Sequence, residues 1–211
     1  MNAEAPTTRR RLVVVATLVV GAASLAYTLR LEPGDDRFLL GAAWMAGVWA
    51  FGALLSGPLR HSTAGRTGLA LGVGLLAGLL AVAVCVAGGL VVNSVPSLRE
   101  PAQQLLAHTG ADPVAVVALA LVNGVAEEMF FRGALYDAVP ARIAVPLTTT
   151  VYALTTIGSG VALLVVAAVL LGAAAAVLRR RTGGILAPAV LHLTWSAGML
   201  LLLPTVLATG G

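Results

Sequence analysis

Two adjacent glutamates inside an apolar stretch are the residues best placed to do chemistry. Glu127 and Glu128 lie in the run from Pro113 to about Leu135. They come about 14 residues after its start, or about 20 Å along a helix. Glu128 can form an ion pair with Arg132, four residues on, whereas Glu127 points about 100° away and lacks that partner. A buried carboxylate is costly unless it has a function, so Glu127 is the candidate general base.

A histidine in the last apolar run is the natural partner for this carboxylate. His192 lies at a depth in the run from Ile185 to about Val206 that is compatible with Glu127, and Ser196 follows one turn later on the same face. We therefore expect His192 opposite Glu127. Two simpler interpretations stay open: the glutamates only hold helices together, with Asn123, Glu128 and Arg132 in supporting roles, and His192 only bonds to a neighbour.

The elements that must position these residues are membrane-spanning helices. Of the 211 residues 59% are apolar and 10% are charged, too few charges to cover a water-facing surface. Apolar blocks of the length needed to cross a bilayer recur along the chain. The prediction is an all-α, polytopic membrane helix bundle of about seven transmembrane helices. The expected spans are Leu12–Leu29, Phe38–Leu55, Leu69–Val92, Pro113–Leu135, Ile143–Ile157, Val161–Leu178 and Ile185–Val206.

The arginines predict how these helices cross the membrane. All 13 basic residues are arginine, a bias typical of a high-GC bacterium. With the N-terminus in the cytoplasm, alternating spans put ten arginines inside and three outside. We therefore expect a multi-pass protein of the cell membrane with its N-terminus cytoplasmic and its C-terminus outside. The net charge of +4 comes from arginines at the helix ends, so it indicates contact with membrane lipid and not with nucleic acid.

Some features of the first half are open to two interpretations. The run after Arg11 could be a signal peptide cut near Ser24–Ala26, but its length favours a retained first helix. The segment Asn93–Asp112 could hold a short interfacial helix or a plain loop. Glycines at 68, 72, 74 and 78 fit the spacing for close helix contact. Cys85 is alone and is expected to fill apolar space.

The motifs themselves resemble those of the CPBP family, which includes the CAAX prenyl endopeptidases and the Abi-like bacteriocin-processing and immunity proteins. Glu127-Glu128-x-x-x-Arg132-Gly133 resembles its first motif. His192-x-x-x-Ser196 resembles a later His-x-x-x-Asn motif, with serine in the last place. The likeness runs from about Pro113 to Leu201. It divides the chain into N-terminal helices and outer loop, residues 1–112, and a CAAX-protease-like core, residues 113–205.

The resemblance implies roles for these residues and shows one departure. The family has Phe-x-x-x-His between the two motifs, and the best register here is Tyr152-x-x-x-Thr156. Carried over, Glu127 is the general base and His192 and Ser196 stabilise the oxyanion. Thr156 could bind a water but cannot take its proton. With a single intramembrane histidine and with Glu128 held by Arg132, three zinc ligands are not available, and no cofactor is expected.

Three functions fit this pattern. The first is a CPBP-type intramembrane endopeptidase that hydrolyses a peptide bond near the cytoplasmic membrane face. The second is a catalytically inactive relative that binds a peptide or a membrane protein in a scaffold or immunity role. The third is a small transporter or channel in which Glu127 responds to protons or cations. The oligomeric state and the substrate sequence are left open by these motifs.

Overall fold

The structure is a computed structural model that describes residues 7–61, 65–95, 97–100, 103 and 112–208. Within these residues the secondary structure is helical and contains no strand. This confirms the predicted all-α class. The elements are α1 (Thr8–Thr28), α2 (Arg37–Ser56), α3 (Thr67–Asn93), α5 (Pro113–Glu128), the π-helix η2 (Met129–Leu135), α6 (Tyr136–Ala138), α7 (Ala141–Ile157), α8 (Ala162–Thr182) and α9 (Leu186–Ala208).

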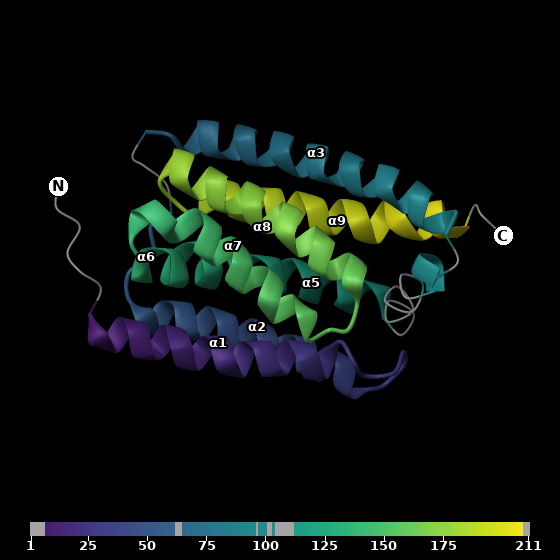
Figure 1. The fold of residues 1–211 in the computed structure, drawn as a ribbon, viewed down its shortest axis with the longest axis horizontal. Helices are drawn as coiled ribbons and strands as arrows, with labels where there is room; N and C mark the ends of the chain where they lie inside the picture. The colour runs from purple at the N-terminus through teal and green to yellow at the C-terminus, as the bar shows by residue number, and fades with distance from the viewer. Residues whose placement is uncertain (1–6, 62–64, 96, 101–102, 104–111, 209–211) are drawn as a thin grey trace.

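The long helices run side by side with alternating direction (Figure 1). α1 pairs with α2 along one side of the bundle, and α3 pairs with α9 along the opposite side. α5, α7 and α8 lie between these two pairs. The helices from the first half of the chain therefore pack directly against those of the second half, and α2 and α9 both contact α5.

Most of the long described helices have the length and apolarity that a membrane crossing needs. Six stretches qualify among the described residues, with α5, η2 and α6 counted together as the span Pro113–Ala138. The remaining long helix, α7, has 17 residues and contains Pro146. It matches the short crossing expected over Ile143–Ile157. A polytopic bundle of about seven transmembrane helices is confirmed.

The alternating directions give the bundle two chemically different ends (Figure 1). The end where α1, α3, α7 and α9 begin carries most of the arginines, and we call it the arginine-rich end. The other end, where α2, α5 and α8 begin, is the arginine-poor end. α1 begins at the first and α9 finishes at the second, as an odd number of crossings requires.

Local sequence signals explain where α5 begins and where α8 ends. The Asp112 carboxylate accepts a hydrogen bond from the Ala115 amide at 3.0 Å, and Pro113 occupies the first turn of α5. α8 ends at Thr182, and the capping residue Gly183 has a φ of +73°, in the left-handed region that favours glycine. The π-helix η2 has no such local signal, and the sequence did not predict it.

Of the glycines at 68, 72, 74 and 78 in α3, the last two contact α9 and the first two do not. A Cβ atom at Gly74 would lie 2.6 Å from the Ala187 carbonyl oxygen, and one at Gly78 would lie 2.5 Å from Thr194 Cβ. These two glycines let α9 approach closely, as predicted. Gly68 and Gly72 have nothing within 4 Å, so they make no such contact. The interfacial helix considered for Asn93–Asp112 falls mostly on residues outside the described ranges.

Candidate active site

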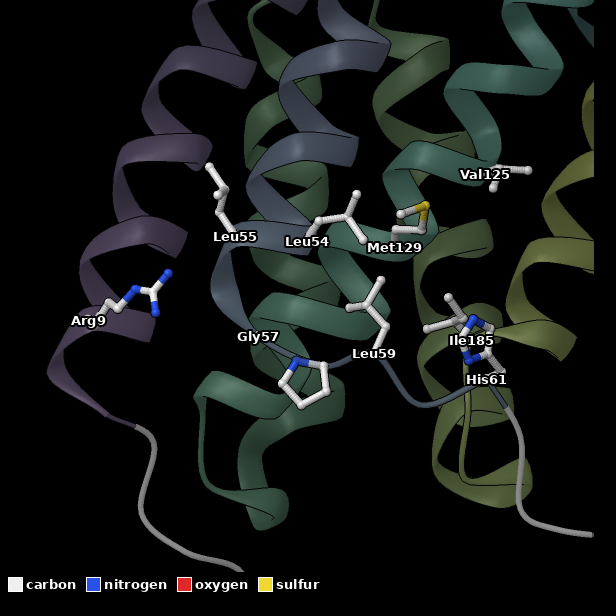
Figure 2. A pocket seen from close by; sticks show the side chains of 10 residues that line it. Arg9, Leu54, Leu55, Gly57, Leu59, His61, Val125, Met129 and Ile185 are labelled. Atoms are coloured by element: carbon white, nitrogen blue, oxygen red, sulfur yellow. The ribbon is translucent and has the colours of Figure 1, made fainter.

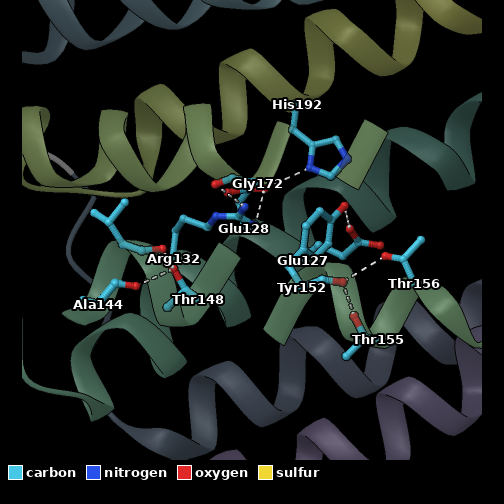
Figure 3. A network of polar contacts seen from close by, with 11 residues as sticks. Glu127, Glu128, Arg132, Ala144, Thr148, Tyr152, Thr155, Thr156, Gly172 and His192 are labelled. Carbon is cyan, nitrogen blue, oxygen red and sulfur yellow. Dashed lines mark hydrogen bonds and ion pairs between the residues drawn. The ribbon is translucent and has the colours of Figure 1, made fainter. Parts of the chain in front are cut away.

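Glu127 and Glu128 occupy the last turn of α5, just before the π-helix. Both side chains are buried, and they point to different neighbours. Glu127 faces α7, where the Tyr152 hydroxyl donates a 2.7 Å hydrogen bond to its Oε2 atom. Figure 3 shows this pair beside the separate group around Glu128. The two adjacent carboxylates thus belong to two different contact networks.

Glu128 is the centre of a fully buried ionic group. Its Oε1 atom accepts a hydrogen bond from Arg132 Nη1 at 3.1 Å and lies 3.0 Å from His192 Nδ1 (Figure 3). Arg132 also donates to the Gly172 carbonyl of α8 at 3.0 Å. Glu128 and Arg132 have no solvent exposure. The expected Glu128–Arg132 ion pair is present, and it joins α5, η2, α8 and α9.

His192, expected opposite Glu127, lines the same cavity as that residue, and the hydrogen bond of its imidazole is to Glu128. His192 Nδ1 reaches Glu128, because Gly124 and Glu128 lie one turn apart on the face of α5 that meets α9. A Cβ atom at Gly124 would lie 3.1 Å from His192 Cδ2, so glycine there makes room for the imidazole ring. Glu127 lies about 100° around the helix and meets α7 instead.

The contact with Glu128 also determines which nitrogen of His192 carries hydrogen. A carboxylate that is paired with arginine only accepts hydrogen bonds, so Nδ1–H is the donor to Glu128. The neutral ring then presents Nε2 as an acceptor. To donate to an oxyanion, as the family resemblance implies, His192 must also carry a second proton on Nε2.

The other residues singled out from the sequence, Thr156, Ser196 and Asn123, line the same cavity as Glu127. Thr156 donates its hydroxyl hydrogen to the Tyr152 carbonyl at 2.9 Å, so that hydrogen is used within α7. Ser196 is buried one turn along α9 from His192. Asn123 donates to the Ala42 carbonyl at 3.0 Å and thereby ties α5 to α2.

Most of these residues line one cavity of about 510 Å³. It lies in the half of the bundle towards the arginine-poor end, between the later turns of α1, α3, α7 and α9 and the early turns of α2, α5 and α8. Most of its surface is apolar. The polar residues at its lining that matter here are Asn123, Glu127, Tyr152, Thr156, His192 and Ser196. Glu128 and Arg132 are not among its lining residues.

A second cavity of about 640 Å³ lies on another side of α5, at the arginine-rich end (Figure 2). Leu54, Leu59, Met129 and other apolar side chains line it, with Arg9 and His61 at its polar rim. No carboxylate lines it. The side chain in this lining that could accept a proton from water is the imidazole of His61.

The residues present do not make an obvious metal site. Over the described parts of the chain, no group of three His, Cys, Asp or Glu side chains is close enough to hold a metal ion. Glu128 and His192 bond to each other, and Glu127 bonds to Tyr152. A catalytic zinc ion needs three protein ligands and an open position.

The fold and the cavity define a class: a polytopic helical membrane protein with a carboxylate in an internal, largely apolar chamber. Residues 109–198 match the family described as type II CAAX prenyl endopeptidase, Rce1-like. This match confirms the resemblance drawn from the Glu127–Gly133 and His192–Ser196 motifs, and it covers a little under half of the chain. Comparisons with curated proteins and with solved structures find no match.

The matched family consists of CAAX-type intramembrane endopeptidases, so a peptide substrate and a membrane environment are what this family implies. The match covers α5, η2, α6, α7, α8 and the first half of α9. These are the elements that hold Glu127, Glu128, Arg132, Tyr152 and His192. The helices outside the match, α1 to α3, complete the wall of the cavity.

Tyr152 is the residue near Glu127 that the sequence did not single out as part of the site. The sequence pattern included it only as the first position of the Tyr152-x-x-x-Thr156 register, with no role in the site. The available signal was a hydroxyl group where the family pattern has phenylalanine. Its position beside Glu127 depends on how α7 rotates against α5, and the sequence pattern does not contain that rotation.

Proposed function

We propose that this protein is an intramembrane endopeptidase in which Glu127 is the general base. The observation that carries the proposal is the position of Glu127, a buried carboxylate that lines a cavity together with His192 and Ser196. Among the described residues its hydrogen-bond partner is the hydroxyl of Tyr152 and not an arginine. The neighbouring Glu128, by contrast, is already neutralised by Arg132. A carboxylate that is free to exchange a proton is what water activation needs.

The proposed reaction is a balanced peptide hydrolysis. Glu127 takes a proton from a water molecule, and the water oxygen bonds to the carbonyl carbon of the peptide. The carbon–nitrogen bond then breaks, and the proton held by Glu127 passes to the leaving nitrogen. The Ser196 hydroxyl can donate to the oxyanion, and doubly protonated His192 can do the same from Nε2.

The cavity suggests a cleavage depth that differs from the one the sequence favoured. Glu127 is the fifteenth residue of the 26-residue span Pro113–Ala138, close to its middle. The cavity extends from there towards the arginine-poor end. We propose that the arginine-rich end faces the cytoplasm, following the positive-inside rule. The scissile bond would then lie near mid-membrane, deeper than the cytoplasmic face proposed from the sequence.

The direct test is the substitution Glu127→Gln in protein reconstituted into liposomes with a library of transmembrane peptides. We expect the wild type to release cleaved peptides and Glu127→Gln to lose at least about 10²-fold in rate, because the amide cannot take a proton. Glu32→Gln changes an exposed glutamate outside the cavity and is the matched control. Cleavage by Glu127→Gln at the wild-type rate would refute the assignment of the base.

A second candidate function is supported by Thr156. This residue stands where the family pattern has histidine, and its hydroxyl hydrogen is donated to the Tyr152 carbonyl. Under this alternative the chain binds a peptide or a membrane protein in the cavity without cutting it. If Thr156→His gains peptidase activity while the wild type only retains the peptide, the binding function is supported.

A further inference from the structure

We infer that Tyr152 replaces the missing histidine as the polar partner that holds Glu127 ready for catalysis. This inference rests on the proposed function, because it concerns the same carboxylate. It assigns Tyr152 as a positioning residue that acts through Glu127, and it moves this part of the site from Thr156 to Tyr152, one helical turn earlier in α7.

The first support is the contact itself. The Tyr152 hydroxyl donates to Glu127 Oε2 at 2.7 Å, and both side chains are buried. Both residues also line the same cavity. Among the described residues, this hydroxyl is the group that bonds to the Glu127 side chain. The contact occupies Oε2, so Oε1 is the oxygen that remains to receive a proton from water.

The second support is that the tyrosine ring is held firmly. The Phe131 ring lies edge-on to it with the ring centroids 4.8 Å apart, and the Arg132 guanidinium lies over its face at 4.8 Å. On a further side is Gly172, where a Cβ atom would come within 3.1 Å of Tyr152 Cδ1. The surrounding residues therefore direct the hydroxyl towards Glu127.

The third support is the contrast with Thr156. Its hydroxyl hydrogen is given to the backbone carbonyl of Tyr152 at 2.9 Å, and Thr155 donates to the same carbonyl at 2.7 Å. Such bonds to a carbonyl one turn back are common for threonine in helices. Thr156 therefore contributes no hydrogen to Glu127. The polar group that reaches this carboxylate from α7 is the hydroxyl of Tyr152.

The chemical consequence is a fixed general base. A carboxylate in an apolar chamber can rotate between orientations unless a donor holds one of its oxygens. The Tyr152 hydroxyl supplies that donor and keeps its own proton through the reaction. The water then meets Oε1 in a constant geometry, which is the kind of positioning that raises the turnover rate without changing substrate binding.

The test compares Tyr152→Phe with Thr155→Val in the peptidase assay. Tyr152→Phe removes one oxygen and keeps the ring, and we expect kcat to fall by about 10²-fold with KM nearly unchanged. Thr155→Val should stay within about threefold of the wild type, because its hydroxyl donates only to the Tyr152 carbonyl and the residue does not line the cavity. A wild-type kcat for Tyr152→Phe would overturn the inference.

A rescue experiment separates positioning from simple packing. The double variant Tyr152→Phe with Thr156→His restores a phenylalanine and histidine pair in α7. We expect it to regain at least about tenfold in kcat over Tyr152→Phe alone, because the imidazole supplies a new polar partner for Glu127. If the tyrosine only filled space, a histidine one turn away would give no rescue, and that result would count against the inference.

A measurement that needs no activity keeps the inference testable if the proposed function fails. The chain has three tyrosines, so labelling with tyrosine that carries ¹³C at Cζ gives few resonances, and Tyr152→Phe assigns one of them. We expect Glu127→Ala to shift the Tyr152 resonance and Glu32→Ala to leave it in place. An unchanged resonance in Glu127→Ala refutes the contact. An inactive wild type with a shifted resonance refutes only the peptidase proposal.

Discussion

α5 runs from a hollow apolar chamber in the arginine-poor half of the bundle to a region of paired charges in the arginine-rich half. In the arginine-rich half Arg132 is bonded to Glu128, and Arg179 is bonded to Asp137 at 2.9 Å and to the Arg132 carbonyl at 2.7 Å. In the arginine-poor half a cavity of about 510 Å³ reaches Glu127. Two neighbouring glutamates lie on either side of this boundary.

The difference shows how one helix can separate structural from reactive charge. Glu128 is held by a guanidinium and an imidazole, so its negative charge is neutralised within the protein. Glu127 is held by a neutral hydroxyl and faces the chamber. A buried ion that lacks its partner costs several kcal/mol. Substitutions on the two sides should therefore have different consequences: on the paired side they lower stability, and on the hollow side they lower activity.

The largest effect on stability is expected for Arg132→Met. It removes the guanidinium that neutralises Glu128, and neither residue has solvent exposure. Breaking a buried pair by removing one partner costs about 3–5 kcal/mol. Unfolding by denaturant in mild detergent should show this loss, while Glu127→Gln should lose about 1 kcal/mol or less.

The matched control for this variant is Arg142→Met, which removes an exposed arginine near the start of α7. It should change stability by no more than about 0.5 kcal/mol. Adding Glu128→Gln to Arg132→Met should recover part of the loss, because the unpaired charge is then removed as well. Equal stability of Arg132→Met and Arg142→Met would break the comparison between the two halves.

Much of the fold could be predicted because membrane crossings depend on composition and length. The run Leu12–Leu29 became α1, Thr8–Thr28, and Ile143–Ile157 became α7, Ala141–Ile157. Lipid excludes most charge, so blocks of apolar residues mark the crossings with little help from tertiary contacts. The π-helix Met129–Leu135 could not be foreseen in this way, since no residue type in it specifies the extra residue per turn.

The site was only partly predictable for a related reason. Position in the sequence gives the depth of a residue in the bilayer. Glu127 and His192 were expected at compatible depths, and both line one cavity. Position in the sequence does not give the direction in which each helix is rotated. That rotation directs His192 Nδ1 to Glu128 and brings Tyr152 to Glu127. The absence of a Cβ atom at Gly124 was the local clue to the first of these contacts.

A smaller effect is expected for Gly124→Ala, which tests the close contact between α5 and α9 that brings His192 to Glu128. The new Cβ atom would lie 3.1 Å from His192 Cδ2, so the ring must shift by a few tenths of an ångström. Crowding of this kind in a packed interior costs about 1–3 kcal/mol. We expect a loss of about 1–2 kcal/mol in unfolding measurements, together with a change in the imidazole resonances of His192.

The control for Gly124→Ala is Gly72→Ala in α3, where nothing lies within 4 Å of the added Cβ atom. Alanine favours the helix over glycine by about 0.5–1 kcal/mol. Gly72→Ala should therefore be as stable as the wild type or slightly more stable. If both substitutions raise stability alike, α5 and α9 are not in the close contact that brings His192 to Glu128.

The smallest effect is expected for Asp137→Asn, at the arginine-rich end of the bundle. Asp137 bonds to Arg179 at 2.9 Å and lies 3.8 Å from Arg10, and 16% of its side chain is exposed. Asp137 is partly exposed, so water screens its ion pairs in part, and we expect a loss of about 1 kcal/mol that shrinks further at high salt. Arg179 keeps its bond to the Arg132 carbonyl, which limits the damage.

Comparison with Asp36→Asn, an exposed aspartate at the arginine-poor end, isolates the contribution of the Asp137 pairs. A loss near that of Arg132→Met would show that the ion pairs of Asp137 and the ion pair of Glu128 form one coupled unit. A loss of about 1 kcal/mol would instead place the stabilising charge at Glu128 and Arg132. In that case the ion pair that stabilises the fold belongs to Glu128, the residue next to Glu127, the carboxylate proposed for catalysis.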